Sequence, residues 1–267
     1  MHSRNDGAHF MDTWKDNIYF VLVEPKEPGN IGASARAIKN MGFRNLCLVN
    51  PPPEMTDEGR WFARNSHDIL DSAMNFSSVA DAVKDRSLIV GTTRISGKRR
   101  GIILPAGEGA AKLCTMAANN TIAILFGREA RGLLRREIDE CGFMLTIPSS
   151  TAQPSLNLSH AVLIIAYELF LADPGRSDTT KARRPYIIQP DSGVAPPLQR
   201  HGESAGLYEK ISGALELLDY IPKGDRNMKK KIMVDLRHFI GRAGLTDAEL
   251  TMLKGICCQV EKKIDRR

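Results

Sequence analysis

Short apolar runs separated by helical patterns are the feature that most constrains how this chain can fold. The runs are rich in β-branched and aromatic residues, which is typical of strands buried on both faces. They are IYFVLVE at residues 18–24, LCLVN at 46–50, SLIVG at 87–91, TIAILFG at 121–127 and FMLTI at 143–147. Helical patterns lie between them, and strands joined by crossovers of this length run parallel. The sequence therefore predicts an α/β fold, a parallel sheet with helices on both faces.

The second half of the chain changes character. Residues 174–205 are rich in proline and glycine and show no sustained period, which indicates a linker. Beyond it, apolar residues recur every three or four positions, and a capping box opens the last helical pattern at Thr246. We therefore expect a polar leader at residues 1–15, an α/β domain at 16–173, the linker, and a small all-helical C-terminal domain at 206–267.

Composition limits the class of protein and its partners. Hydrophobic residues make up 42% and charged residues 25% of the 267 residues, which is typical of soluble globular proteins. No window approaches the roughly 18 apolar residues that span a bilayer, so we expect a cytoplasmic protein without membrane contact. Neither the five cysteines nor the six histidines show metal-ligand spacing, so no metal is expected. A net charge of +6 favours a polyanionic partner such as nucleic acid.

The first candidate motif is EPKEPGNIGASARAIKNMG, after the first predicted strand. It places Gly29 and Gly32 in a turn, Asn30 between them, and Arg36 in the helix that follows. Backbone without side chains can approach a ligand here, and helix N–H groups can meet an anion. The alternative is a tight turn that needs positive φ. The motif lacks the third glycine and the acidic ribose ligand of a dinucleotide-binding loop, which argues against a nucleotide-dependent oxidoreductase.

Two further motifs carry polar residues where strands end or helices begin. Gly127, Arg128 and Glu129 follow a buried strand, at the end where parallel α/β enzymes build their sites. The alternative is an Arg–Glu pair that caps a loop. The segment IPSSTAQPSLNLSHAV places Ser155 and Asn157 where a loop becomes a helix. On its own, this segment indicates no more than helix capping by Ser155.

In this order and at these strand ends, the three motifs resemble those of the SPOUT methyltransferases, specifically the TrmH or SpoU class of RNA ribose methyltransferases. The resemblance covers about residues 18–172. Within the class, VLVEPKEPGNIGASARAIKNMGF and RHFIGRAGLTDAELTMLKGI are most similar to the branch that methylates the anticodon loop of tRNA. The resemblance implies a sheet whose carboxyl end is tied into a deep trefoil knot, an exception to the rule against knots. It also implies a homodimer with sites at the shared interface.

The resemblance implies S-adenosylmethionine as the cofactor, held largely by backbone groups of three loops. The matching positions are Thr92, Thr93, Arg94, Gly127, Ile147, Pro154, Ser155 and Leu156. All of them follow the ends of predicted strands or precede a predicted helix.

The resemblance also assigns the central catalytic role to the arginine of the first motif, here Arg36. A guanidinium with a pKa above about 12 is a poor base in water, so we expect Arg36 to bind phosphate and stabilise the developing alkoxide. Whether it also removes the proton is left open. The other recurring polar positions match Asn30, Glu129, Ser155 and Asn157. We expect them to orient Arg36, the ribose and the loop.

The predicted function is S-adenosylmethionine-dependent 2′-O-methylation of a ribose in tRNA, at nucleotide 32 of the anticodon loop. With Arg36, the basic residues Lys98, Arg99 and Arg100 are expected to contact tRNA phosphates, although an ordinary solvated surface explains each equally well. Two alternatives are open: the same transfer to ribosomal RNA or another tRNA position, and a non-catalytic RNA-binding protein of the same fold. No motif encodes whether cytidine or uridine is accepted.

Overall fold

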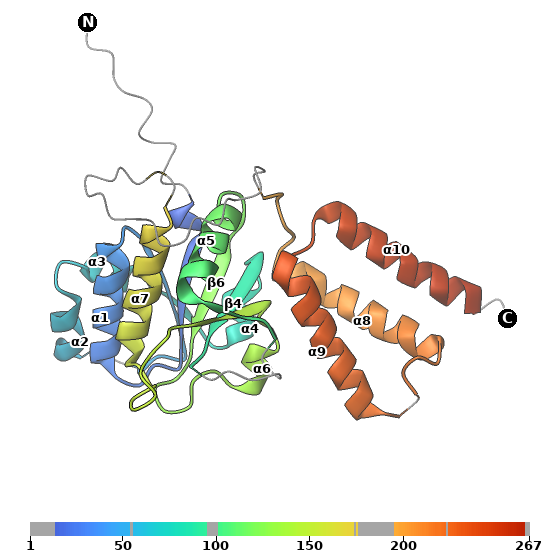
Figure 1. Cartoon of the computed structure of the whole chain (residues 1–267), viewed down its shortest axis with the longest axis horizontal. Coiled ribbons are helices and arrows are strands. Elements are labelled where there is room, and N and C mark those ends of the chain that lie inside the picture. The colour runs from blue at the N-terminus through green and yellow to red at the C-terminus, as the bar shows by residue number, and fades with distance from the viewer. Residues whose placement is uncertain are drawn as a thin grey trace, which may run out of the picture.

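The computed structural model describes residues 14–53, 56–94, 101–173, 175, 195–222 and 224–264. Within these residues, an α/β domain lies beside a group of three long helices (Figure 1). Seven strands form one sheet in the order β3-β2-β1-β6-β4-β7-β5, and every neighbouring pair is parallel. The strands are β1 (Ile18–Val23), β2 (Asn45–Val49), β3 (Met74–Phe76), β4 (Leu88–Thr92), β5 (Ile103–Pro105), β6 (Ile122–Phe126) and β7 (Phe143–Thr146).

Helices cover both faces of the sheet, as predicted. Along β1 the side chains alternate, so that Ile18, Phe20 and Leu22 belong to one buried cluster and Val21 and Val23 to another. The first cluster includes residues of α1 (Pro28–Asn40), α5 (Ala106–Ala117) and α7 (Leu158–Leu171), and the second residues of α4 (Val79–Val83) and α6 (Arg135–Ile138). Because both faces are buried, the strands read as continuous apolar runs.

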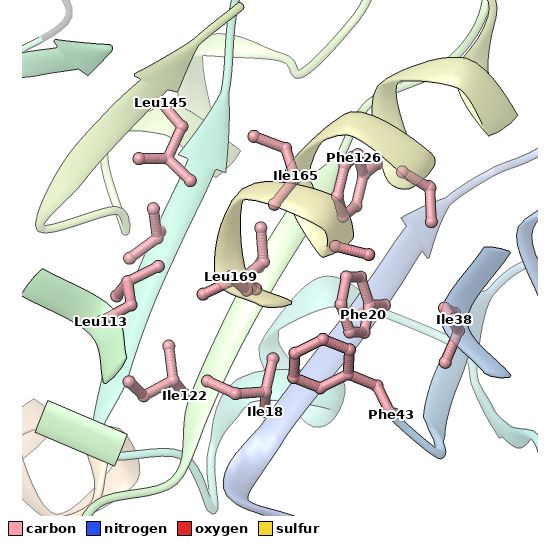
Figure 2. Close-up of a cluster of buried hydrophobic side chains, with 14 of the residues drawn as sticks. Ile18, Phe20, Ile38, Phe43, Leu113, Ile122, Phe126, Leu145, Ile165 and Leu169 are labelled. Carbon is pink, nitrogen blue, oxygen red and sulfur yellow. The ribbon is translucent and has the colours of Figure 1, made fainter. Parts of the chain in front are cut away.

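The larger cluster is organised around Phe20, in the middle of the sheet (Figure 2). Its ring packs edge-on against Phe43, at 5.3 Å between centroids, and stacks on Phe126 at 6.1 Å. Ile165 and Leu169 of α7 reach the same cluster (Figure 2). Burial of each such side chain contributes about 1.5–3 kcal/mol. This packing holds β1, β6 and α7 together and therefore positions the loops that follow the two strands.

The sequence patterns do not predict four short elements. These are α2 (Asp57–Ala63), α3 (His67–Asp71), β3 and β5. The two strands have three residues each and lie at opposite edges of the sheet, where only part of each residue is buried. They therefore lack the apolar runs of the central strands. Helix α1 begins at Pro28, so it already includes Gly29 and Gly32, which the motif predicts in a turn before it, and proline is favoured in the first turn of a helix.

The C-terminal helices form a unit with its own core. They are α8 (His201–Leu217), α9 (Arg226–Ala243) and α10 (Asp247–Ile264). Their shared buried residues are Leu207, Tyr208, Met233, Ile240, Leu245 and Leu250. The predicted capping box is confirmed, because the Thr246 N–H donates to Glu249 Oε2 at 2.8 Å and the Glu249 N–H donates to Thr246 Oγ1 at 3.3 Å. Helix α8 begins inside the stretch predicted as linker.

This helical unit contacts the α/β domain at several places, of which two involve backbone groups at the starts of β7 and α8. A Cβ at Gly142, just before β7, would lie 1.9 Å from the carbonyl oxygen of Gly241 in α9, so the two backbones touch. At the start of α8, the His201 N–H donates to Arg86 O at 2.7 Å and its ring Nε2 lies 3.0 Å from Glu140 Oε2. These contacts fix α8 and α9 against the segments that precede β4 and β7.

The predicted class, a parallel α/β sheet with added C-terminal helices, is confirmed, and the trefoil knot stays a prediction. Lys98, Arg99 and Arg100 lie outside the described residues, as do residues 1–13 of the expected leader and 176–194 of the expected linker. None of the described helices is long and apolar enough to cross a membrane.

Candidate active site

Glu129 joins the loop after β6 to the loop after β1. Its carboxylate accepts hydrogen bonds from the backbone N–H of Lys26 at 3.2 Å, from the N–H of Glu27 at 3.4 Å, and from Asn30 Nδ2 at 3.2 Å. A carboxylate can only accept, and these three donors converge on it. Glu129 therefore fixes the start of α1, with the side chain of Asn30 in a defined direction.

Asn157 brings in the third predicted segment. Its Nδ2 donates to Asn30 Oδ1 at 2.9 Å, and its Oδ1 accepts from the Ser159 N–H at 2.8 Å. Asn157 is thus the N-cap of α7, and the predicted cap at Ser155 is wrong. Ser155 is exposed and lines a pocket beside these residues. Asn30 Nδ2 donates to Glu129, and Asn30 Oδ1 accepts from Asn157. The hydrogen bonds therefore run from Asn157 through Asn30 to Glu129.

Arg36 lies apart from this chain of hydrogen bonds. It is six residues beyond Asn30 in α1, about 9 Å further along the axis, and it points to a different side of the helix. The side chain is exposed and is not among the residues that line the pocket. It forms no ion pair with any residue in the described ranges. The structure therefore brings Asn30, Glu129 and Asn157 together. Arg36 has no ion pair within the described ranges.

Three loops enclose a pocket of about 190 Å³ at the carboxyl ends of β4, β6 and β7. Every position predicted to hold the cofactor lines it: Thr92, Thr93, Arg94, Gly127, Ile147, Pro154, Ser155 and Leu156. Two hydrogen bonds tie the loops together, from Thr92 Oγ1 to Leu125 O at 3.0 Å and from the Thr93 N–H to Leu145 O at 2.9 Å. The walls combine apolar side chains with backbone groups and hydroxyls.

The loop after β6 folds back on itself at two glycines. Arg128 and Gly132 exchange backbone hydrogen bonds of 3.2 and 2.8 Å. A Cβ at Gly127 would lie 2.1 Å from the carbonyl carbon of Gly132, so no other residue fits there. Gly132 has a φ of +65°, which favours glycine. The loop therefore exposes backbone along the pocket wall and positions Glu129.

Arg128 has a role that the sequence did not reveal. Its guanidinium is buried between two carboxylates: Nε donates to Glu24 Oε2 at 2.7 Å, Nη2 also contacts Glu24, and Nη1 donates to Glu137 Oε2 at 2.9 Å. The hydrogen bond from Arg128 holds the pKa of Glu24 below its usual value, and the two carboxylates raise the pKa of Arg128. Arg128 thus binds the end of β1 while its neighbour Glu129 binds the loop beyond it. The alternative of an Arg–Glu pair within this loop is therefore wrong, because Arg128 pairs with Glu24 and Glu137.

The glycines of the first motif serve helix packing. Gly29 and Gly32 lie inside α1, and neither has positive φ, so the predicted turn is wrong. A Cβ at Gly32 would lie 1.9 Å from the carbonyl oxygen of Gly59 in α2. Phe62 lies 3.3 Å from the corresponding position at Gly29. The missing side chains make room for α2, not for a ligand.

Residues 17–167 match the model of the SpoU rRNA methylase family. The chain belongs to this family. As a SpoU methylase it is an enzyme, an RNA 2′-O-methyltransferase, as the resemblance of its motifs implied. Residues 203–267 match a second model, the C-terminal domain of the tRNA methyltransferase TrmJ.

Individual relatives agree with both matches. This SpoU methylase is 34% identical over 247 residues to the tRNA (cytidine/uridine-2′-O-)-methyltransferase TrmJ of Sodalis glossinidius, covering 92% of this chain and 91% of the relative. It is 31% identical to the TrmJ of Photorhabdus laumondii, covering 92% and 98% of the two chains. The crystal structure of TrmJ from Z. mobilis ZM4 has the same fold, with a TM-score of 0.71 at 24% identity over 91% of this chain and 98% of that one.

Proposed function

We propose that the protein transfers a methyl group from S-adenosylmethionine to the 2′-hydroxyl of the ribose at nucleotide 32 in the anticodon loop of tRNA. The observation that carries the proposal is the chain of hydrogen bonds through Glu129, Asn30 and Asn157 beside a pocket built from three loops. The tRNA substrate is supported by the names of the relatives and by the C-terminal match, which together extend over most of the chain.

The pocket fits the proposed cofactor by its chemistry. Ile147, Leu156 and Phe126 provide apolar walls for a flat base, and the Thr92 and Thr93 segment adds hydroxyl and backbone groups for polar atoms. At Gly132 a Cβ would meet no atom within 4 Å, so this wall keeps space that a side chain would take. When bound, S-adenosylmethionine supplies a methyl group activated by a positively charged sulfur.

The chain's own residues must place the ribose and handle its proton. Asn30 and Asn157, oriented by Glu129, which lines the pocket, offer amide groups to hydrogen-bond the substrate. Arg36 is exposed and forms no ion pair with the part of the chain that the structure describes, so we expect its guanidinium to bind an RNA phosphate and to stabilise the oxygen on which negative charge develops. Ser155 lines the same pocket and completes the proposed set.

A homodimer is part of the proposal. Helix α7, which packs on α1, exposes Leu163 and Tyr167 at 38% and 45% of their surfaces, and Leu156 is 36% exposed just before it. Exposed apolar side chains grouped on one helix favour a protein interface. Arg36 does not line the pocket of its own chain. A second copy on this face would bring its own side chains near that pocket. We also place the protein in the cytoplasm, where its five free thiols would stay reduced.

The test is methyl transfer to tRNA. Purified protein with labelled S-adenosylmethionine is expected to methylate an unmodified tRNA transcript, and mass spectrometry of nuclease fragments is expected to locate the methyl group at the ribose of nucleotide 32. Arg36→Ala should reduce the rate by about 100-fold or more while the melting temperature is retained. Arg44→Ala, another exposed arginine, is the matched control.

Each result bears on a separate part of the proposal. Full activity of Arg36→Ala would remove its assigned role. Methylation of a ribosomal RNA fragment in preference to tRNA would show that tRNA is not the substrate. A methyl group at another nucleotide of tRNA would show that nucleotide 32 is not the target.

A further inference from the structure

A second, larger cavity of about 880 Å³ lies between the α/β domain and helices α8 and α9. It begins at the carboxyl ends of β1, β2 and β3, where Glu24, Asn50 and Ser77 follow the strands. In parallel sheets this edge is where ligands bind. The opposite wall is formed by α8 and α9, including Tyr208 and Ser212.

Two residues at the strand ends adopt unusual backbone conformations. Glu24 has a φ of 48° and Asn50 a φ of 45°, in the left-handed region that non-glycine residues seldom occupy. Both line the cavity. Such conformations cluster at functional sites, because the surrounding structure must hold them in place.

The cavity also contains a polar atom without a partner. Ser212 of α8 is 6% exposed, and its Oγ forms no hydrogen bond to any residue that the structure describes. Buried hydroxyl groups are almost always hydrogen-bonded, so this one has capacity for a polar group that enters the cavity. Ser77 and Asn50, on the facing wall, are further uncharged donors and acceptors.

Most charged residues of the cavity are paired, but Lys84 and Arg136 on the sheet side and Glu209 on α8 form no ion pair within the described ranges. Glu140 pairs with His201, and Glu216 pairs with Lys229 at 2.5 Å. Lys84 and Arg136, by contrast, are exposed. The uncharged polar groups of Asn50, Ser77 and Ser212 suit the edge of a base, and the exposed guanidinium of Arg136, which also interacts with the charge of Glu24, suits a phosphate.

The cavity and the pocket for the cofactor share a wall. Glu24 and Glu137 line the cavity, and both bind Arg128, which lines the pocket. An RNA strand whose ribose reaches the pocket therefore passes next to the cavity. We propose that the cavity receives an unpaired nucleotide adjacent to the methylated one, with its base among Asn50, Ser77 and Ser212 and its phosphate on Arg136. This inference rests on the proposed function and adds a substrate-binding site to it.

Two glycines of α8 give a matched pair of test variants. A Cβ at either Gly213 or Gly206 would meet no atom within 4 Å, but only Gly213 lines the cavity. Gly213→Leu therefore fills part of the cavity, whereas Gly206→Leu projects elsewhere, and both substitutions raise helix propensity. Neither is expected to lower the melting temperature.

The first measurement is binding of an unmodified tRNA transcript by fluorescence anisotropy, together with the KM for tRNA and for S-adenosylmethionine. Gly213→Leu should weaken tRNA binding and raise its KM by about tenfold, the size expected for loss of one base contact. The KM for S-adenosylmethionine should not change. Gly206→Leu should behave as the unaltered protein.

The second measurement is the salt dependence of tRNA binding. Arg136→Gln should lower the slope of log affinity against log salt by about one, as expected for one lost phosphate contact, and Arg44→Gln should not.

Equal tRNA affinity of Gly213→Leu and Gly206→Leu would overturn the proposal. So would binding of free uridine or cytidine monophosphate in the cavity with no effect on tRNA when the cavity is filled. Failure of the proposed function would give a different result, because the unaltered protein would then transfer no methyl group to tRNA. The anisotropy measurement would still test whether the cavity binds tRNA.

Discussion

Asn157 donates a hydrogen bond of 2.9 Å to Asn30, across 127 residues of chain. The same side chain caps α7 through the Ser159 N–H, so one amide both holds the first turn of α7 and orients Asn30 of the first motif. The capping function needs only the oxygen of the amide, whereas the contact with Asn30 needs its nitrogen. The two functions can therefore be separated by substitution.

Asn157→Asp should keep the cap and lose the contact. A carboxylate still accepts from Ser159, but it cannot donate to Asn30 Oδ1 and places an acceptor against an acceptor. We expect a melting temperature near that of the unaltered protein and a kcat at least about tenfold lower. Asn157→Ala should also lose about 1 kcal/mol of stability, measured by urea denaturation, because the cap is removed. Equal kcat in Asn157→Asp and the unaltered protein would show that the contact has no part in catalysis.

Arg128→Ala tests the buried ion pairs that join the loops. The substitution leaves Glu137, whose side chain is 4% exposed, as an uncompensated buried carboxylate. Loss of one partner of a buried pair costs about 3–5 kcal/mol, and the lower end applies because Glu24 is 40% exposed. Arg44→Ala breaks the exposed pair with Asp16, whose side chains are 67% and 47% exposed, and should cost less than about 1 kcal/mol. Similar urea midpoints for the two variants would contradict a structural role for Arg128.

Gly32→Ala tests whether this glycine serves packing. Its Cβ would lie 1.9 Å from the backbone oxygen of Gly59, so α1 and α2 must move apart. Overpacking of this kind costs about 1–3 kcal/mol. Gly206→Ala, in a helix with open space at the same atom, should instead stabilise by about 0.5–1 kcal/mol. Urea denaturation of both proteins gives the comparison, and a Gly32→Ala protein as stable as Gly206→Ala would exclude close packing as the reason for the glycine.

Gly32 also shows what sequence patterns can and cannot settle. The glycine spacing locates the motif after the first strand correctly, but the reason for the glycine lies in α2, a short helix that no pattern predicts. The same holds for Arg128: its place at a strand end marks it as a site residue, while its partners Glu24 and Glu137 depend on how two loops meet. The central strands are predictable because burial on both faces leaves continuous apolar runs.

The cavity between sheet and tail could not be predicted at all. Its walls come from strand ends and from α8 and α9, and the docking of these elements depends on contacts such as Gly142 with Gly241. Gly142 belongs to no motif, and the segment that contains Gly241 does not indicate this contact, because close approach of two backbones leaves no mark in a single sequence. The residues that the family resemblance assigns to the cofactor, by contrast, all line one pocket, although no pattern in a single sequence gives these positions.

The last prediction concerns pH and the attachment of the helical tail. Glu140 is hydrogen-bonded by His201, and Arg237 adds a favourable charge, so the pKa of this carboxyl is lowered in the folded protein. A lowered folded-state pKa contributes stability that is fully present above the unfolded-state pKa, about 4.3, and is lost as the pH falls through the folded-state value. The melting temperature of the unaltered protein should therefore fall below about pH 4.3 more steeply than that of Glu140→Gln. Asp235→Asn, an exposed position in α9, should follow the unaltered protein. Parallel curves for Glu140→Gln and the unaltered protein would show that this contact does not hold the tail to the sheet.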